Sequence, residues 1–187
     1  ILLALCLTGA AGCQKWLDVT PKTDVKGKVL FSNQAGFRDA LIGIYSLMTT
    51  GNSYGSEMTL ATTDVLAPVY DNVRSTAKYL YTDAVVQNRF ANIWRQQYTG
   101  VVNANLILAN IDEKKSVFTS GNYQVVKGEA LALRALLHFD VLRLFSPSAL
   151  TGADKKAIPY VTAYTNVPAE QFTVAQVLDM VIKDLTG

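Results

Sequence analysis

The sequence predicts a mainly α-helical fold of stacked antiparallel helix pairs, tetratricopeptide-like in packing, with long irregular loops. The first observation is the segment Lys127–Phe145, which contains no proline and is rich in strong helix formers. The second is that its apolar residues form two stripes, a pattern typical of a helix packed on both sides. The third is the short polar turn Lys114–Ser120, which joins this helix to another long helical stretch and so predicts an antiparallel pair.

The central helix is predicted to run from about residue 121 to residue 145, where Pro147 stops it. One apolar stripe consists of Leu131, Ala135, Phe139 and Leu142, and the other of Leu133, Leu137, Val141 and Leu144. Polar residues separate the stripes: Glu129, Asp140 and Arg143 on one edge, Arg134 and His138 on the other. Because His138 lies in mid-helix beside this packing, we expect a packed, hydrogen-bonded histidine rather than a base or a ligand.

The first thirteen residues read as an export signal followed by an anchor. Ile1–Leu7 is apolar and Thr8–Gly12 is small and neutral, as in a signal peptide whose basic start is missing. Cys13 follows Ala-Ala-Gly, so residues 1–12 are expected to be removed and Cys13 lipidated. The alternative is an ordinary signal peptide with an incidental cysteine. Residues 13–32 are then a lipid anchor and an extended tether.

Four further helices are expected around the central one. Ser32 or Asn33 can cap a helix over about 33–49, and a second helix is predicted over Gly55–Leu66, ended by Pro68. After a long loop, a helix over about 88–111 carries the stripe Phe90, Trp94, Tyr98, Val101, Ala104 and Leu108. Trp94 is expected to be core. Ile158–Val161 is expected to be a short extended segment, and Thr173 to cap a last helix with the core face Val174, Val177, Leu178, Val181, Ile182 and Leu185.

Composition excludes several classes of function. A net charge of +2 with scattered Lys and Arg gives no basis for nucleic-acid binding. The two cysteines, Cys6 and Cys13, lie in the leader region, so no thiolate metal site or disulfide framework is expected in the folded part. No catalytic or cofactor motif occurs, and Asp112–Glu113 reads as a solvated helix end rather than a pair of catalytic carboxylates. We therefore predict a protein that is not an enzyme and has no cofactor.

The loop 69–86 is the predicted binding site, because long ordered loops in compact domains are usually functional. Aromatic rings bind the C–H faces of sugars, while amide, carboxylate and guanidinium groups bind the hydroxyls. Candidate ligand-binding residues are Tyr70, Asp71, Asn72, Arg74, Tyr79 and Tyr81. The alternative is that the tyrosines fix the loop to the helices.

Four blocks of this sequence resemble the SusD/RagB family of nutrient-binding outer-membrane lipoproteins. In chain order they are CQKWLDVTPKTDV, FSNQAGFRDALIGIYSLM, IWRQQYTGVVNANLILANI and GEALALRALLHFDVLRLF. The resemblance covers nearly all of the chain after Cys13 and corresponds to the N-terminal region of the family, whose members are usually much longer. Residues 33–187 are therefore expected to be a SusD-like N-terminal helical domain that is incomplete at its C-terminus.

The resemblance implies a lipid-anchored, surface-exposed protein of the outer membrane. Such a protein binds a glycan or another nutrient polymer and delivers it to a TonB-dependent, SusC-like transporter. The alternatives are a surface glycan hydrolase and a helical scaffold that binds only protein. Converging acidic residues in a cleft would favour the hydrolase. An aromatic-lined groove open to solvent would favour sugar, and a smooth apolar face would favour protein.

Overall fold

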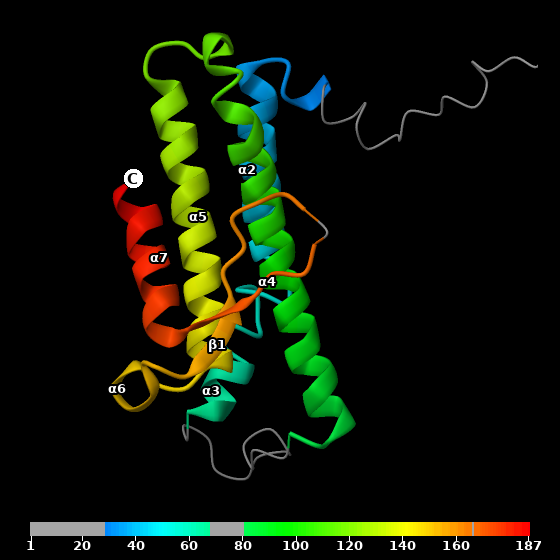
Figure 1. Ribbon diagram of the computed structural model, residues 1–187. Coiled ribbons are helices and arrows are strands. Elements are labelled where there is room, and N and C mark those ends of the chain that lie inside the picture. Colours follow the sequence, from blue (N-terminus) through cyan, green and yellow to red (C-terminus); the bar gives the residue numbers. More distant parts are fainter. Residues whose placement is uncertain (1–28, 68–80, 166) are drawn as a thin grey trace, which may run out of the picture.

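The computed structural model describes residues 29–67, 81–165 and 167–187, and in these ranges the fold is mainly helical, as predicted (Figure 1). Its elements in order are α2 (Gln34–Met48), α3 (Thr62–Leu66), α4 (Ala84–Ile111), η3 (Lys115–Val117), α5 (Asn122–Phe145), α6 (Ala149–Gly152), β1 (Lys156–Pro159), β2 (Gln171–Thr173) and α7 (Val174–Thr186). The predicted signal peptide, Cys13 and most of the tether lie outside the described residues.

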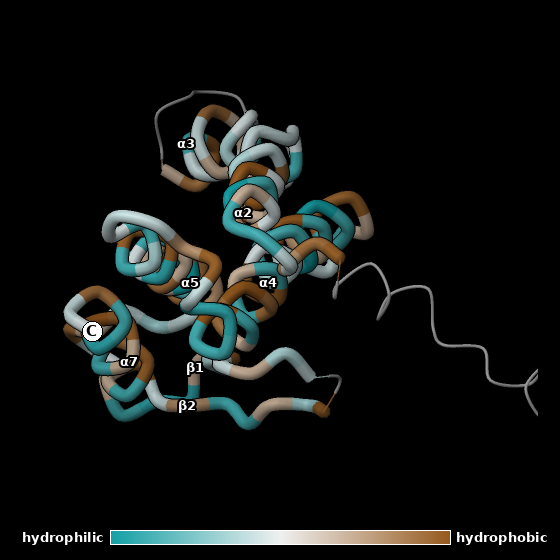
Figure 2. Tube along the Cα trace, turned by 90° about the horizontal axis from the view of Figure 1, so that it is seen from above, coloured by the Kyte–Doolittle hydropathy of each residue, from teal (hydrophilic) through white to brown (hydrophobic). Residues whose placement is uncertain are grey.

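Helix α5 lies between two hydrophobic cores, which confirms the two-sided packing predicted from its stripes. Figure 2, seen from above, places α5 between α7 on one side and α2 with α4 on the other. The first core joins α2, α4 and α5, and it includes the fully buried Phe37, Ile107 and Leu137. The second joins α5, β1 and α7, and it includes Val141 and Val177. Both cores depend on the same helix, so α5 fixes where α4 and α7 lie.

Side-chain caps explain where three of the helices begin. Asn33 accepts the amide of Gly36 at the start of α2, as predicted for this position. Asp83 accepts two amides at the start of α4, so that helix begins four residues earlier than the predicted residue 88. Thr173 forms a reciprocal capping box with Gln176 at the start of α7.

Two predictions about the helices are wrong. The predicted helix over Gly55–Leu66 is a series of turns in which only α3, Thr62–Leu66, is helical. These turns pack tightly, because a Cβ at Gly55 would lie 2.2 Å from the carbonyl oxygen of Thr49. The predicted core face of α7 is too wide: Ile182 and Leu185 are 57% and 60% exposed.

After α6, strands β1 and β2 form a short antiparallel pair, and the segment that joins them crosses α4 (Figure 1). Strand β1 begins at Lys156, two residues before the start of the predicted extended segment 158–161. We call residues 159–163, which begin with the last residue of β1, the strap. In the described ranges, no helix is both long enough and apolar enough to cross a membrane.

Candidate functional site

Most of the predicted binding loop lies outside the residues that the structure describes. Tyr70, Asp71, Asn72, Arg74 and Tyr79 all belong to this part. Tyr81 is described, and it lies just before α4 with about half of its surface exposed. Its ring contacts the ring of Phe90 edge-on, with 5.7 Å between the ring centroids.

An open groove lined by four aromatic rings lies along α4. The rings belong to Phe90, Trp94 and Tyr98 of α4 and to Phe145, the last residue of α5. Trp94 lies 4.8 Å from Tyr98 and 5.0 Å from Phe145, measured between ring centroids. The groove has a volume of about 770 Å³, and its remaining lining residues are Ala91, Arg95, Thr99 and Val102. It is therefore a mostly apolar, aromatic surface with a few polar groups.

The groove arises because the buried face of α4 is turned away from its aromatic stripe. Residues Phe90, Trp94 and Tyr98 are four apart, so they lie along one side of the helix. The fully buried side contains Ile93, Gln97, Val101, Ala104 and Ile107. The three rings are consequently half-buried and all line the groove, and Trp94 and Tyr98 also pack against the second core. The expectation that Trp94 is core is only partly correct, because the side chain packs against the second core but also lines the groove.

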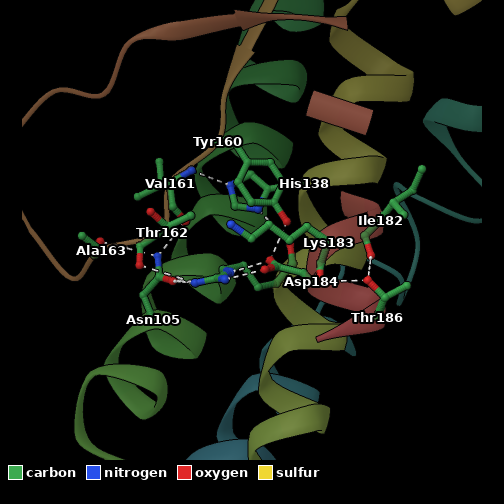
Figure 3. Close-up of polar contacts among 11 residues, drawn as sticks. Asn105, His138, Tyr160, Val161, Thr162, Ala163, Ile182, Lys183, Asp184 and Thr186 are labelled. Carbon is green, nitrogen blue, oxygen red and sulfur yellow. Dashed lines mark hydrogen bonds and ion pairs between the residues drawn. The ribbon is translucent and has the colours of Figure 1, made fainter. Parts of the chain in front are cut away.

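The strap is held against α4 and α5 by polar contacts, and Figure 3 shows those made by Asn105 and His138. The hydroxyl of Tyr98 donates to the carbonyl oxygen of Pro159 at 2.7 Å, and burial raises the pKa of this tyrosine. Asn105 of α4 donates to the carbonyl oxygen of Val161 at 2.8 Å. The backbone N–H of Val161 in turn donates to Nε2 of His138 at 3.0 Å. The strap is thus bound to α4 through Pro159 and Val161 and to α5 through Val161.

These contacts determine the tautomer of His138. Its Nδ1 lies 2.8 Å from the carbonyl oxygen of Arg134, which can only accept, so Nδ1 carries the proton. Nε2 accepts from Val161 and therefore carries none. Burial is the main reason that the pKa of His138 falls from 6.5 to about 4, and the nearby charge of Arg134 lowers it further. The prediction of a packed, hydrogen-bonded histidine is confirmed.

A buried ion pair holds α7 against α5 below the strap. Arg134 donates from Nε and Nη2 to the two carboxylate oxygens of Asp184, both at 2.6 Å. The hydroxyl of Tyr160 donates to Asp184 at 2.6 Å, and Arg134 Nη1 donates to Asn105 at 2.9 Å. Both charged side chains are 9% exposed. Arg134 and Asp184 are not part of any recognisable sequence motif, so their pairing could be found only from the structure.

The acidic residues of the described chain do not form a catalytic arrangement with this groove. None of them is among its lining residues. Asp112 bonds instead to Lys127 at 2.7 Å and to Tyr123, and these bonds hold the pKa of its carboxyl below the usual range. Asp112 is thus part of a solvated helix end, as predicted.

Comparison with known proteins assigns the family. The SusD-like family described as "Starch-binding associating with outer membrane" matches residues 15–187. The chain belongs to the SusD-like family. A SusD-like protein of Formosa agariphila is 20% identical over 156 residues. A crystal structure of a SusD superfamily protein from Bacteroides thetaiotaomicron superposes with a TM-score of 0.67 at 22% identity, and a structure from Bacteroides vulgatus with a TM-score of 0.59 at 21% identity.

These similarities show the SusD-like fold over part of a longer architecture. The alignments cover 78% and 82% of this chain for the Formosa relative and the Bacteroides structures. They cover only 29% of the Formosa protein and 36% of each crystallised chain. The chain therefore spans about a third of the length of the SusD-like proteins that it matches.

Proposed function

We propose that this protein is a surface-exposed outer-membrane lipoprotein that binds a glycan in the aromatic groove and delivers it to a TonB-dependent transporter. The observation that carries the proposal is an open groove with four half-buried rings in a chain of the SusD-like family. Flat aromatic faces suit the apolar C–H faces of sugar rings, and Arg95 and Thr99 provide polar contacts for hydroxyl groups. This arrangement favours sugar binding over a purely protein-binding scaffold.

The rings are suited to this task because their positions are fixed before any ligand arrives. Trp94 contacts Tyr98 and Phe145, and Tyr98 is bonded to the backbone of Pro159. Little side-chain freedom then remains to be lost on binding. Sugar hydroxyls exchange bonds with water for bonds with protein at little net gain, so we expect a weak affinity, about micromolar or poorer.

Calorimetric titration with a panel of polysaccharides tests the site. Trp94→Ala removes the central ring and should weaken binding by about fivefold, since stacked rings contribute on the order of 1 kcal/mol each. Tyr45→Ala is the matched control, because it removes a partly exposed aromatic residue that does not line this groove. Equal affinity in wild type and Trp94→Ala, with unchanged melting temperatures, would exclude the groove as the site.

Two further measurements separate the proposal from its alternatives. Arg74→Ala and Tyr79→Ala test whether the predicted loop contributes ligand contacts. Release of reducing sugar from any polysaccharide would favour the hydrolase alternative instead. Mild detergent extraction should co-purify a large outer-membrane barrel with this protein, and its absence would contradict the proposed partner.

A further inference from the structure

Arg95 differs from most of the arginines in the described chain in having no carboxylate partner there. Arg89 pairs with Glu57, Arg134 with Asp184 and Arg143 with Asp140. The guanidinium of Arg95 donates only to the neutral amide oxygen of Asn92, at 2.9 Å, one turn earlier in α4. Its positive charge is exposed and is not neutralised by a neighbouring anion in the described ranges.

This charge lies on the wall of the aromatic groove. Arg95 is adjacent in sequence to Trp94, and both line the groove. No aspartate or glutamate occurs among the 28 residues of α4 or among the lining residues. A ligand lying on the rings therefore meets one uncompensated cation and no lining carboxylate.

We infer that the groove prefers anionic glycans, those bearing carboxylate or sulfate groups, over neutral ones. The inference rests on the proposed function, because it assigns a ligand class to the same groove. A guanidinium presents several N–H donors in a plane, and it can bind two oxygens of a carboxylate or sulfate at once. A neutral sugar offers Arg95 only hydroxyl groups. It therefore contacts the aromatic rings but forms no ion pair with the guanidinium.

The expected preference is modest, because Arg95 is exposed to solvent. Exposed ion pairs contribute less than about 1 kcal/mol, which corresponds to a two- to fivefold difference in affinity per charged contact. Screening by salt should weaken this part of the binding. The aromatic part should be less sensitive to salt, because it does not depend on a net charge.

The experiment compares soluble starch, carboxymethyl starch and starch sulfate by calorimetry at 50 mM and 500 mM sodium chloride. These probes share one glucan backbone, so they differ in charge and in the identity of the anion. Both anionic forms should bind at least about twofold more tightly than starch at low salt, and the difference should shrink at high salt. Preference for one anionic form alone would identify sulfate or carboxylate as the recognised group.

Substitutions of two arginines test whether Arg95 is the source of the anionic preference. Arg95→Gln should abolish the anionic preference, so that the two anionic forms bind no more tightly than starch, while Arg95→Lys should retain part of the preference. Arg38→Gln is the matched control, because Arg38 is an exposed arginine of α2 that lines a different groove and pairs with no described carboxylate. Arg38→Gln should leave the preference intact, which would exclude an effect of net charge.

Four outcomes would overturn the inference. Starch binding as tightly as both anionic forms would refute it while leaving the proposed function intact. An anionic preference that survives Arg95→Gln, or that Arg38→Gln lowers equally, would show that Arg95 is not its source. Failure of every polysaccharide to bind would refute the proposed function and the inference together.

Discussion

Replacing Asp184 with asparagine should destabilise the protein strongly. The substitution removes the carboxylate that accepts two bonds from Arg134 and one from Tyr160, all at 2.6 Å. Because both partners are only 9% exposed, little water is available to solvate the guanidinium left behind. Removing one member of a buried pair typically costs about 3–5 kcal/mol. For a chain of 187 residues this corresponds to a fall in melting temperature on the order of 10 °C.

Urea unfolding of a double-mutant cycle measures this effect and its origin. Arg134→Met and Asp184→Leu should each be strongly destabilising, whereas the double variant should be about 2–3 kcal/mol more stable than their sum predicts. Asp112→Asn is the matched control, because Asp112 pairs with Lys127 at a similar distance, 2.7 Å, but is 62% exposed. It should cost no more than about 1 kcal/mol. The argument that burial makes this ion pair important would be refuted if Asp184→Asn lowered the free energy of unfolding as little as Asp112→Asn. It would also be refuted if the effects of Arg134→Met and Asp184→Leu simply added in the double variant.

Three other predictions concern packing, pH and anchoring. Gly100→Ala should destabilise the protein, because the added Cβ would lie 2.6 Å from a methyl carbon of Leu137. Gly43→Ala is the control: a Cβ added there would have no atom within 4 Å, so this substitution should be neutral or should stabilise the protein by up to about 1 kcal/mol. Thermal melts compare the two variants. Because the folded-state pKa of His138 is lowered from 6.5 to about 4, its neutral form contributes stability above pH 6.5. Up to about 3 kcal/mol should be lost as the pH falls from 6.5 to 4, and urea titrations of His138→Gln should lack this slope. Cys13→Ala should release the protein from membranes, and mass spectrometry of the wild-type N-terminus should find an acyl group.

The starts of α2 and α7 are predicted well because a capping residue marks each of them. Asn33 and Thr173 cap α2 and α7 where expected, because a side-chain oxygen that satisfies free amides is a local signal. The segment before α3 was predicted poorly for the opposite reason. Its Ser, Thr and Gly residues make local turns, with bonds such as Tyr54 N–H to the carbonyl oxygen of Met48, that compete with a helix.

The aromatic groove could be predicted only in part. The spacing of Phe90, Trp94 and Tyr98 places them on one side of α4, but a sequence does not show which side faces the core. The buried side includes two polar residues, Gln97 and Asn105, which a search for apolar stripes passes over. Gln97 bonds to Ser53 across the interface with the turns, so its burial depends on a contact far away in sequence.

The groove and the buried polar network are parts of one structure because both are attached to α5. Phe145, at the end of α5, forms one wall of the groove, and His138, two turns earlier, holds the strap. The strap in turn holds Tyr98, the ring at the other end of the aromatic row, through the carbonyl oxygen of Pro159. A binding surface needs rings whose positions are determined by packing and hydrogen bonds rather than by the ligand. Helix α5 therefore does more than fill two cores: it supplies Phe145 to the groove and, through His138 and the strap, helps to fix Tyr98.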